Sequence, residues 1–218
     1  MLPNKPYSIS ALSLAIVLAL SACHREVKPA PEFKRSEYNK IVISNAVEPS
    51  TLDPQKSSDM AAGAIIRQMM DGLVSTDAEG KTIPALALKW ESSDEGRVWT
   101  FHLRDANWSN GDPITAEDFV YSFRRLADPA TAAPNSSYLE DAKIQGAAEI
   151  LQGKAKPDTL GVKALDKKTL QFTLTAPVPY FPDMLTQQFT YPVHRATVEK
   201  FGEKWTQPGN YVSSGAYI

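Results

Sequence analysis

The strongest constraint on the fold comes from residues 98–127, where a strand pattern gives way to a helix pattern within a short stretch of chain. Large apolar and more polar residues alternate in 98–103, which predicts a half-buried strand. A turn-rich loop, 106–113, follows, and Thr115 can then cap an amphipathic helix whose apolar stripe begins at Phe119. A strand that leads into a packed helix predicts a mixed α/β or α+β architecture.

The rest of the chain continues this mixture of strands, hairpins and separated helices. We expect a strand at 41–44, a helix from Met60 that Asp59 caps and Gly72 ends, a hairpin turn at 77–80, a hairpin of 161–165 with 169–174, and short helices at 144–152, 183–188 and 196–204. Trp108 and Phe119 are expected to be buried in the core rather than to take part in chemistry.

Composition excludes several classes of function. The chain has 218 residues, with 23 basic and 25 acidic side chains and a formal net charge of −2, so a nucleic-acid partner is not expected. One cysteine excludes an internal disulfide and a multi-cysteine metal site. The three histidines, His24, His102 and His194, lack the spacing of a metal motif, so we predict no metal site and no cofactor.

The chain also lacks the common catalytic motifs, such as the G-x-S-x-G, S-x-x-K, H-E-x-x-H and phosphate-loop patterns. His102 falls on the polar face of its strand and reads as a cross-strand residue rather than a base. Arg124 and Arg125 suit the negative end of a helix, and Asp53, before a proline, is most simply a turn residue. We therefore do not expect an enzyme.

The amino terminus resembles an export signal. A positive charge at Lys5 precedes an apolar run, 9–20, that is shorter than the ~20 residues of a spanning helix. It ends in Leu-Ser-Ala followed by Cys23, the only cysteine, which resembles a bacterial lipobox. We predict a signal peptide at 1–22 and a lipidated Cys23 that opens a polar tether, 23–40.

Residues 98–134, VWTFHLRDANWSNGDPITAEDFVYSFRRLADPATAAP, resemble a signature of the bacterial extracellular solute-binding proteins of family 5. Within that family the similarity is greatest to the oligopeptide-binding components of ABC importers. Further matching segments occur in the family's order at 51–54, 160–165, 176–181, 198–208 and 214–217.

The resemblance implies a periplasmic binding protein-like fold of three α/β lobes, of which this chain holds the amino-terminal ones. It divides the body into the first part of a large lobe I (41–71), a small lobe II (72–192) and a return to lobe I (193–218). The implied function is peptide capture through backbone hydrogen bonds, without chemistry. The implied partners are peptides and an ABC permease and ATPase, and the implied location is the periplasm, lipid-anchored to a membrane.

By the same resemblance, ligand contacts come from Ser58, Asp59 and Met60 after the Asp-Pro turn, and from Asn135 and Tyr138 after the helix. Two of these residues depart from the family pattern. Ser58 stands where oligopeptide receptors often carry glutamate, and Asn135 stands where they often carry an aromatic residue. Asp59 offers a nearby negative charge in place of the glutamate.

Members of the family are more than twice as long as this chain, so we expect a truncated, incomplete copy without the second half of the binding cleft. Two other functions remain open at this point. One is an envelope lipoprotein with a sensor or chaperone-like role, and the other is a nickel- or haem-binding member of the family.

The lipobox leads to a direct prediction. Metabolic labelling with a radioactive fatty acid should mark the wild-type chain, and Cys23→Ser should abolish the label because the thiol that carries the lipid is gone. Equal labelling of both proteins would show that Cys23 is not the acceptor.

Overall fold

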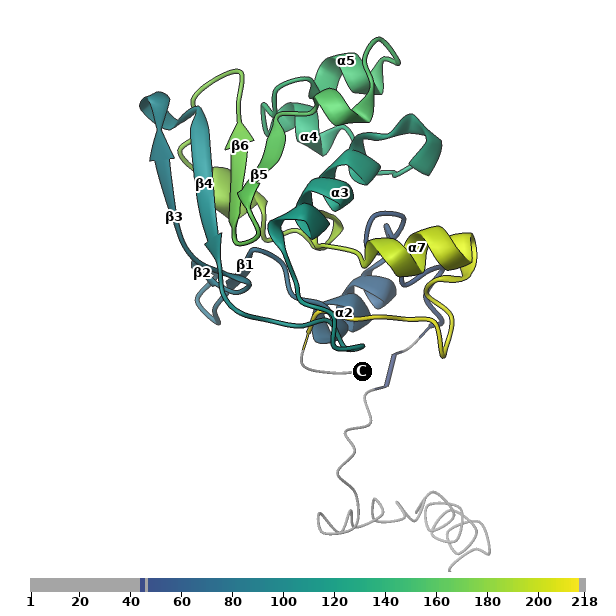
Figure 1. Cartoon of the computed structure of the whole chain (residues 1–218). Coiled ribbons are helices and arrows are strands. Elements are labelled where there is room, and N and C mark those ends of the chain that lie inside the picture. Colours follow the sequence, from purple (N-terminus) through teal and green to yellow (C-terminus); the bar gives the residue numbers. More distant parts are fainter. Residues whose placement is uncertain (1–43, 46, 216–218) are drawn as a thin grey trace, which may run out of the picture. The chain divides into compact units, whose positions relative to one another are not determined.

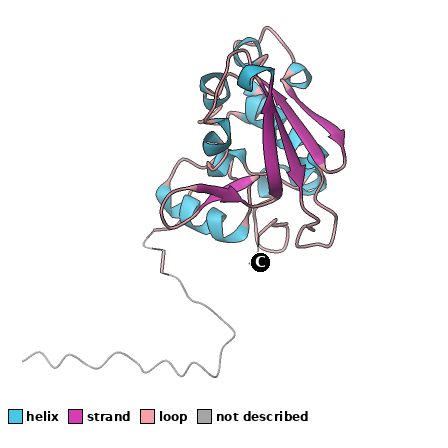
Figure 2. Cartoon of the chain, turned by 90° about the vertical axis from the view of Figure 1, so that its left-hand side faces the viewer, coloured by secondary structure: helices cyan, strands magenta, loops and turns pink. Residues whose placement is uncertain are grey.

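A four-stranded antiparallel sheet organises the fold, with strand order β3-β4-β6-β5. The computed structural model describes residues 44–45 and 47–215. The predicted signal peptide, Cys23, the whole tether and most of the predicted strand at 41–44 therefore lie outside the described residues. The strands are β3 (Ala87–Ser93), β4 (Val98–Leu103), β5 (Val162–Asp166) and β6 (Thr169–Thr173), and a separate ribbon pairs β1 (Val74–Thr76) with β2 (Thr82–Pro84). Figure 2 shows the long strands side by side, apart from the ribbon.

One face of the sheet forms an aromatic core. The alternation in β4 buries Trp99, Phe101 and Leu103, as the sequence predicts. The Phe101 ring meets the Phe172 ring edge-on, with centroids 5.8 Å apart, and Phe172 meets Phe123 in the same way at 4.9 Å. Phe123 belongs to α3 (Ala116–Ala127), which lies against β5 and β6 (Figure 1). Strand and helix thus share one core.

The start of α3 is fixed by its cap. The Asp118 carboxylate accepts hydrogen bonds from the backbone N–H of Thr115 at 2.8 Å and from its hydroxyl at 2.9 Å. This confirms the predicted start of the helix and places Phe119 fully inside the core. Trp108 is buried as well, with 2% of its surface exposed.

The remaining helices are short. They are α2 (Met60–Met69), α4 (Tyr138–Asp141), α5 (Ala147–Leu151), α6 (Phe181–Met184) and α7 (Arg195–Phe201), with 3₁₀ turns η1 (Asp94–Gly96), η2 (Pro129–Thr131), η3 (Pro157–Thr159), η4 (Gln188–Thr190) and η5 (Gly202–Lys204). Asp59 caps α2, as predicted. Among the described residues, no helix is both long and apolar enough to cross a bilayer.

The structure corrects four details of the sequence prediction. The helix expected at 144–152 is shorter, Ala147–Leu151, and Ile144 instead forms a β-bridge with Leu174. The helix from Met60 ends at Met69 rather than at Gly72, whose lack of a side chain admits Tyr191: a Cβ there would lie 2.6 Å from the tyrosine ring. The helix expected at 183–188 is instead Phe181–Met184, and Gln188 belongs to the following 3₁₀ turn. The helix expected to run to Lys204 stops at Phe201, because Gly202 adopts φ 53° and ψ −130°.

One strand is absent from the sequence prediction altogether. β3 lies at one edge of the sheet, and all but two of its residues are exposed. An exposed edge strand carries little of the alternation by which strands are recognised. His102 of β4 lies where the sequence places it, as a cross-strand residue whose Nε2 is 2.8 Å from Glu91 of β3.

A buried ion pair joins distant parts of the chain. The guanidinium of Arg125 in α3 donates to both carboxylate oxygens of Asp53, at 2.6 and 3.2 Å. The same carboxylate accepts from the indole N–H of Trp205 at 3.1 Å, and the Gln55 amide donates to the Ser122 carbonyl at 2.6 Å. Asp53 is therefore a turn residue, as predicted, and its carboxylate also belongs to an interior network. The sequence prediction for Arg125 was incomplete in the same way.

This network should be costly to break. Arg125→Ala leaves the buried Asp53 carboxylate without its cation, which should lower the free energy of unfolding by about 3–5 kcal/mol. Urea denaturation followed by circular dichroism measures the change. Arg124→Ala is the matched control, because among the described residues the Arg124 side chain donates only to the Asp158 carbonyl. Equal midpoints for wild type and Arg125→Ala would contradict the role given to the pair.

The aromatic core gives a second stability prediction. Phe119 is fully buried on α3, so Phe119→Ala should leave a cavity and cost about 3–5 kcal/mol of folding stability. The expected result is a clear drop in the urea midpoint. An unchanged midpoint would show that Phe119 does not support the core.

Candidate functional site

A polar hollow of about 260 Å³ lies where three separate segments meet. The first is the stretch that leads into α2, the second is the loop around Asn135, and the third is the run from Gln187 into η4. The residues that line it are Ser57, Ser58, Asp59, Met60, Gly63, Arg67, Asn135, Gln187, Gln188 and Phe189. Four of the five predicted ligand-binding residues are in this set: Ser58, Asp59, Met60 and Asn135.

The first wall is built from the Asp53 turn. The Asp53 carbonyl accepts from the backbone N–H of Lys56 at 3.1 Å and of Ser57 at 2.9 Å, which curls the chain towards α2. Asp59 then caps the helix by accepting from the Ala62 N–H at 2.7 Å. Met60, next to it, is 91% exposed, so the hollow has an apolar residue at its edge.

The charge of Asp59 is already used inside the protein. Its Oδ1 faces Ala62, and its Oδ2 accepts from the Ser50 hydroxyl at 2.7 Å. The Ala62 backbone N–H, followed by Ser50, lowers the pKa of this carboxyl below its usual value. Asp59 therefore stays ionised near neutral pH, with its oxygens engaged in holding the wall together.

The second wall contains the other two predicted residues, Asn135 and Tyr138, but only Asn135 lines the hollow. The Asn135 amide lines the hollow, and its nitrogen lies 3.5 Å from the Ser57 carbonyl. Tyr138 is not a lining residue. Its ring packs edge-on against Phe189 with centroids 4.9 Å apart, and its hydroxyl donates to the Met184 carbonyl at 3.2 Å. Tyr138 thus supports the wall from behind, and its assignment as a ligand contact stays a prediction.

Six lining residues are absent from the predicted ligand-binding set: Ser57, Gly63, Arg67, Gln187, Gln188 and Phe189. Gly63 makes room for Gln188, because a Cβ at residue 63 would lie 2.5 Å from the Gln188 amide oxygen. Met60, Gly63 and Arg67 follow the spacing of a single helix face, so the helix pattern held a usable signal. The glutamines come from a segment far away in sequence and had no such signal.

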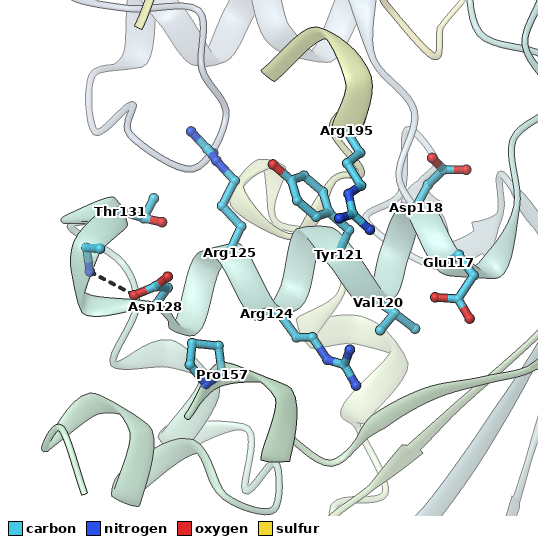
Figure 3. Close-up of a pocket in the computed structure, with 11 residues that line it drawn as sticks. Glu117, Asp118, Val120, Tyr121, Arg124, Arg125, Asp128, Thr131, Pro157 and Arg195 are labelled. Atoms are coloured by element: carbon cyan, nitrogen blue, oxygen red, sulfur yellow. Dashed lines mark hydrogen bonds between the residues drawn. The ribbon is translucent and has the colours of Figure 1, made fainter. Parts of the chain in front are cut away.

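A larger hollow of about 520 Å³ lies along α3 (Figure 3). Its charged groups mostly have partners within the fold. Arg125 pairs with the buried Asp53, the Arg195 Nε lies 2.7 Å from Glu199, and Asp118 caps the helix. None of the predicted ligand-binding residues lines it, so the smaller polar hollow is the candidate site.

Neither hollow suggests metal chemistry. In the part of the chain that the structure describes, no three side chains of histidine, cysteine, aspartate or glutamate are grouped as a metal site would require. The lining of the smaller hollow instead offers amides, hydroxyls and a guanidinium, which are hydrogen-bonding groups.

Comparison with known proteins gives close relatives. The chain is 49% identical over 183 residues to the periplasmic oligopeptide-binding protein OppA of Escherichia coli K12. The matched region covers 84% of this chain and 34% of that protein. The chain is 45% identical over 204 residues to OppA of Haemophilus influenzae, covering 93% of this chain and 38% of that protein. The chain thus spans about a third of the length of these relatives.

Solved structures agree. The crystal structure of Haemophilus influenzae OppA in complex with the peptide RPPGFSPFR superposes with a TM-score of 0.77 and 46% identity, over 79% of this chain and 34% of that one. The unliganded open form of MppA, a periplasmic murein tripeptide binding protein, superposes with a TM-score of 0.76 and 42% identity, over 78% of this chain and 33% of that one. The predicted fold is thereby confirmed.

A family model also matches residues 81–218, which include α3, Asn135 and the segment of Gln187 and Gln188. This match agrees with the resemblance seen in the sequence and with both sets of relatives. The chain therefore belongs to the bacterial extracellular solute-binding proteins, family 5.

Proposed function

We propose that this chain forms one wall of the peptide-binding cleft of an extracytoplasmic receptor for an ABC importer. One observation carries the proposal: Ser58, Asp59, Met60 and Asn135, which come from two distant stretches of sequence, line the same hollow. The names of the relatives add support, since OppA of two species is an oligopeptide-binding protein and one solved OppA holds a nonapeptide.

The lining suits a peptide backbone. Asn135, Gln187 and Gln188 each carry an amide that both donates and accepts hydrogen bonds. A peptide backbone offers the same two groups in alternation, so these side chains pair with it whatever its sequence. Binding of this kind needs no bond to form or break.

The site residues, the partners and the location belong to the same proposal. Ser58, Asp59, Met60 and Asn135 contact the peptide, with Tyr138 at the edge of the site. The receptor works in the periplasm, a location supported by the names of its relatives, which are periplasmic proteins. It delivers peptide to a permease and its ATPase. Cys23 carries a lipid that tethers the body to a membrane of the envelope.

Nuclear magnetic resonance of the isotope-labelled chain tests the peptide site. Titration with trialanine into the millimolar range should shift the side-chain amide signals of Asn135, Gln187 and Gln188. Asn135→Ala removes one amide that bonds the peptide, which should weaken binding about three- to tenfold.

Gln68→Ala is the matched control, because Gln68 is an exposed amide on α2 that does not line the hollow. Its affinity should equal that of the wild type. Signal shifts scattered over the surface, or confined to the larger hollow along α3, would show that the peptide site has been placed wrongly.

A further inference from the structure

Arg67 is the one cation that lines the small hollow. It lies in the last full turn of α2, on the helix face that also carries Met60 and Gly63. Its side chain is exposed rather than packed into the core. A ligand that enters the hollow therefore meets the guanidinium directly.

The position of Arg67 is held by a neutral partner. One of its terminal nitrogens donates to the Gln188 amide oxygen at 3.1 Å, and Gln188 sits there because Gly63 leaves space for it. A guanidinium has five N–H donors in a fixed fork. The others have no hydrogen-bond partner among the described residues.

No carboxylate within the described part of the chain neutralises Arg67. The only other charged residue that lines the hollow is Asp59, whose oxygens are bonded to Ser50 and Ala62. Asp71, further along the chain from α2, pairs instead with Arg104 at 3.2 Å. Arg67 thus differs from Arg125 and Arg195, which both have carboxylate partners.

We propose that Arg67 binds a carboxylate of the ligand, so that this hollow favours peptides that carry an acidic group there. The proposal rests on the proposed function and deepens it. The planar fork of arginine fits a carboxylate with two parallel hydrogen bonds, which a neutral amide cannot match in strength. Gln188 holds the fork in place, and the neutral amides around it bind the peptide backbone.

Two sources offer the same chemistry: the side chain of aspartate or glutamate, and the free carboxyl terminus of the peptide. Four peptides separate them. Ala-Glu-Ala and Ala-Gln-Ala, each with a free and an amidated terminus, differ in one carboxylate at a time.

The purified chain, produced in a bacterial host, is titrated with each peptide by nuclear magnetic resonance. The peptide with the recognised carboxylate should bind about tenfold more tightly than its neutral counterpart, a difference of about 1.4 kcal/mol. Because Arg67 is exposed, the preference should shrink as salt is raised.

Variants assign the effect to Arg67. Arg67→Gln should remove the preference, so that each acidic peptide binds with the same affinity as its neutral counterpart. Arg67→Lys should restore part of it, because the charge returns without the fork. Lys154→Gln removes an equal charge from an exposed site outside the hollow and should change nothing.

The outcomes are distinct. A preference that follows the side chain, or one that follows the terminus, supports the proposal and names the source. Equal affinity for all four peptides, or a preference that survives in Arg67→Gln, overturns it while the proposed function stands. If none of the four binds, both the carboxylate site and the proposed function are wrong.

Discussion

The ion pair between Asp53 and Arg125 is the interaction on which the candidate site depends. Both side chains are largely buried, with 4% and 13% exposed, so their charges must satisfy each other. Trp205 and Gln55 complete the hydrogen bonding of the pair. The Asp53 turn is thereby fixed to α3 and to the segment after α7. Because the turn is fixed, the path of the chain from it into α2 is fixed as well. That path forms one wall of the hollow.

The hollow combines side chains that hold its walls together with side chains that face its interior. The Asp59 carboxylate caps α2, and the packing of Tyr138 against Phe189 supports the opposite wall. Besides Ser58 and Met60, the side chains that face the hollow are the amides of Asn135, Gln187 and Gln188 and the guanidinium of Arg67. A peptide that binds as proposed therefore meets a surface already in place, and little free energy is lost to ordering that surface.

Local signals in the sequence predicted the elements that depend on local interactions. The alternation in β4 and the Thr115 cap of α3 are such cases, and both elements occur where expected. β3 was missed because an exposed edge strand needs no alternation. Asp53 and Arg125 lie far apart in sequence, so each was interpreted by its neighbours alone, as a turn residue and a helix-end residue.

The candidate site divides in the same way. Ser58, Asp59, Met60 and Asn135 were found through resemblance to a family, and the structure brings them together around one hollow. Gln187 and Gln188 reach it only through tertiary folding, and nothing in their own segment predicts this. The helix pattern places Arg67 on the same face as Met60, but an exposed arginine on a helix is common and does not by itself indicate a site. Its role is inferred from its surroundings in the structure: a neutral hydrogen-bond partner, an Asp59 whose oxygens are already bonded, and a polar hollow. Under the proposed function, the amides bind peptides in general, and Arg67, which no described carboxylate neutralises, selects among them.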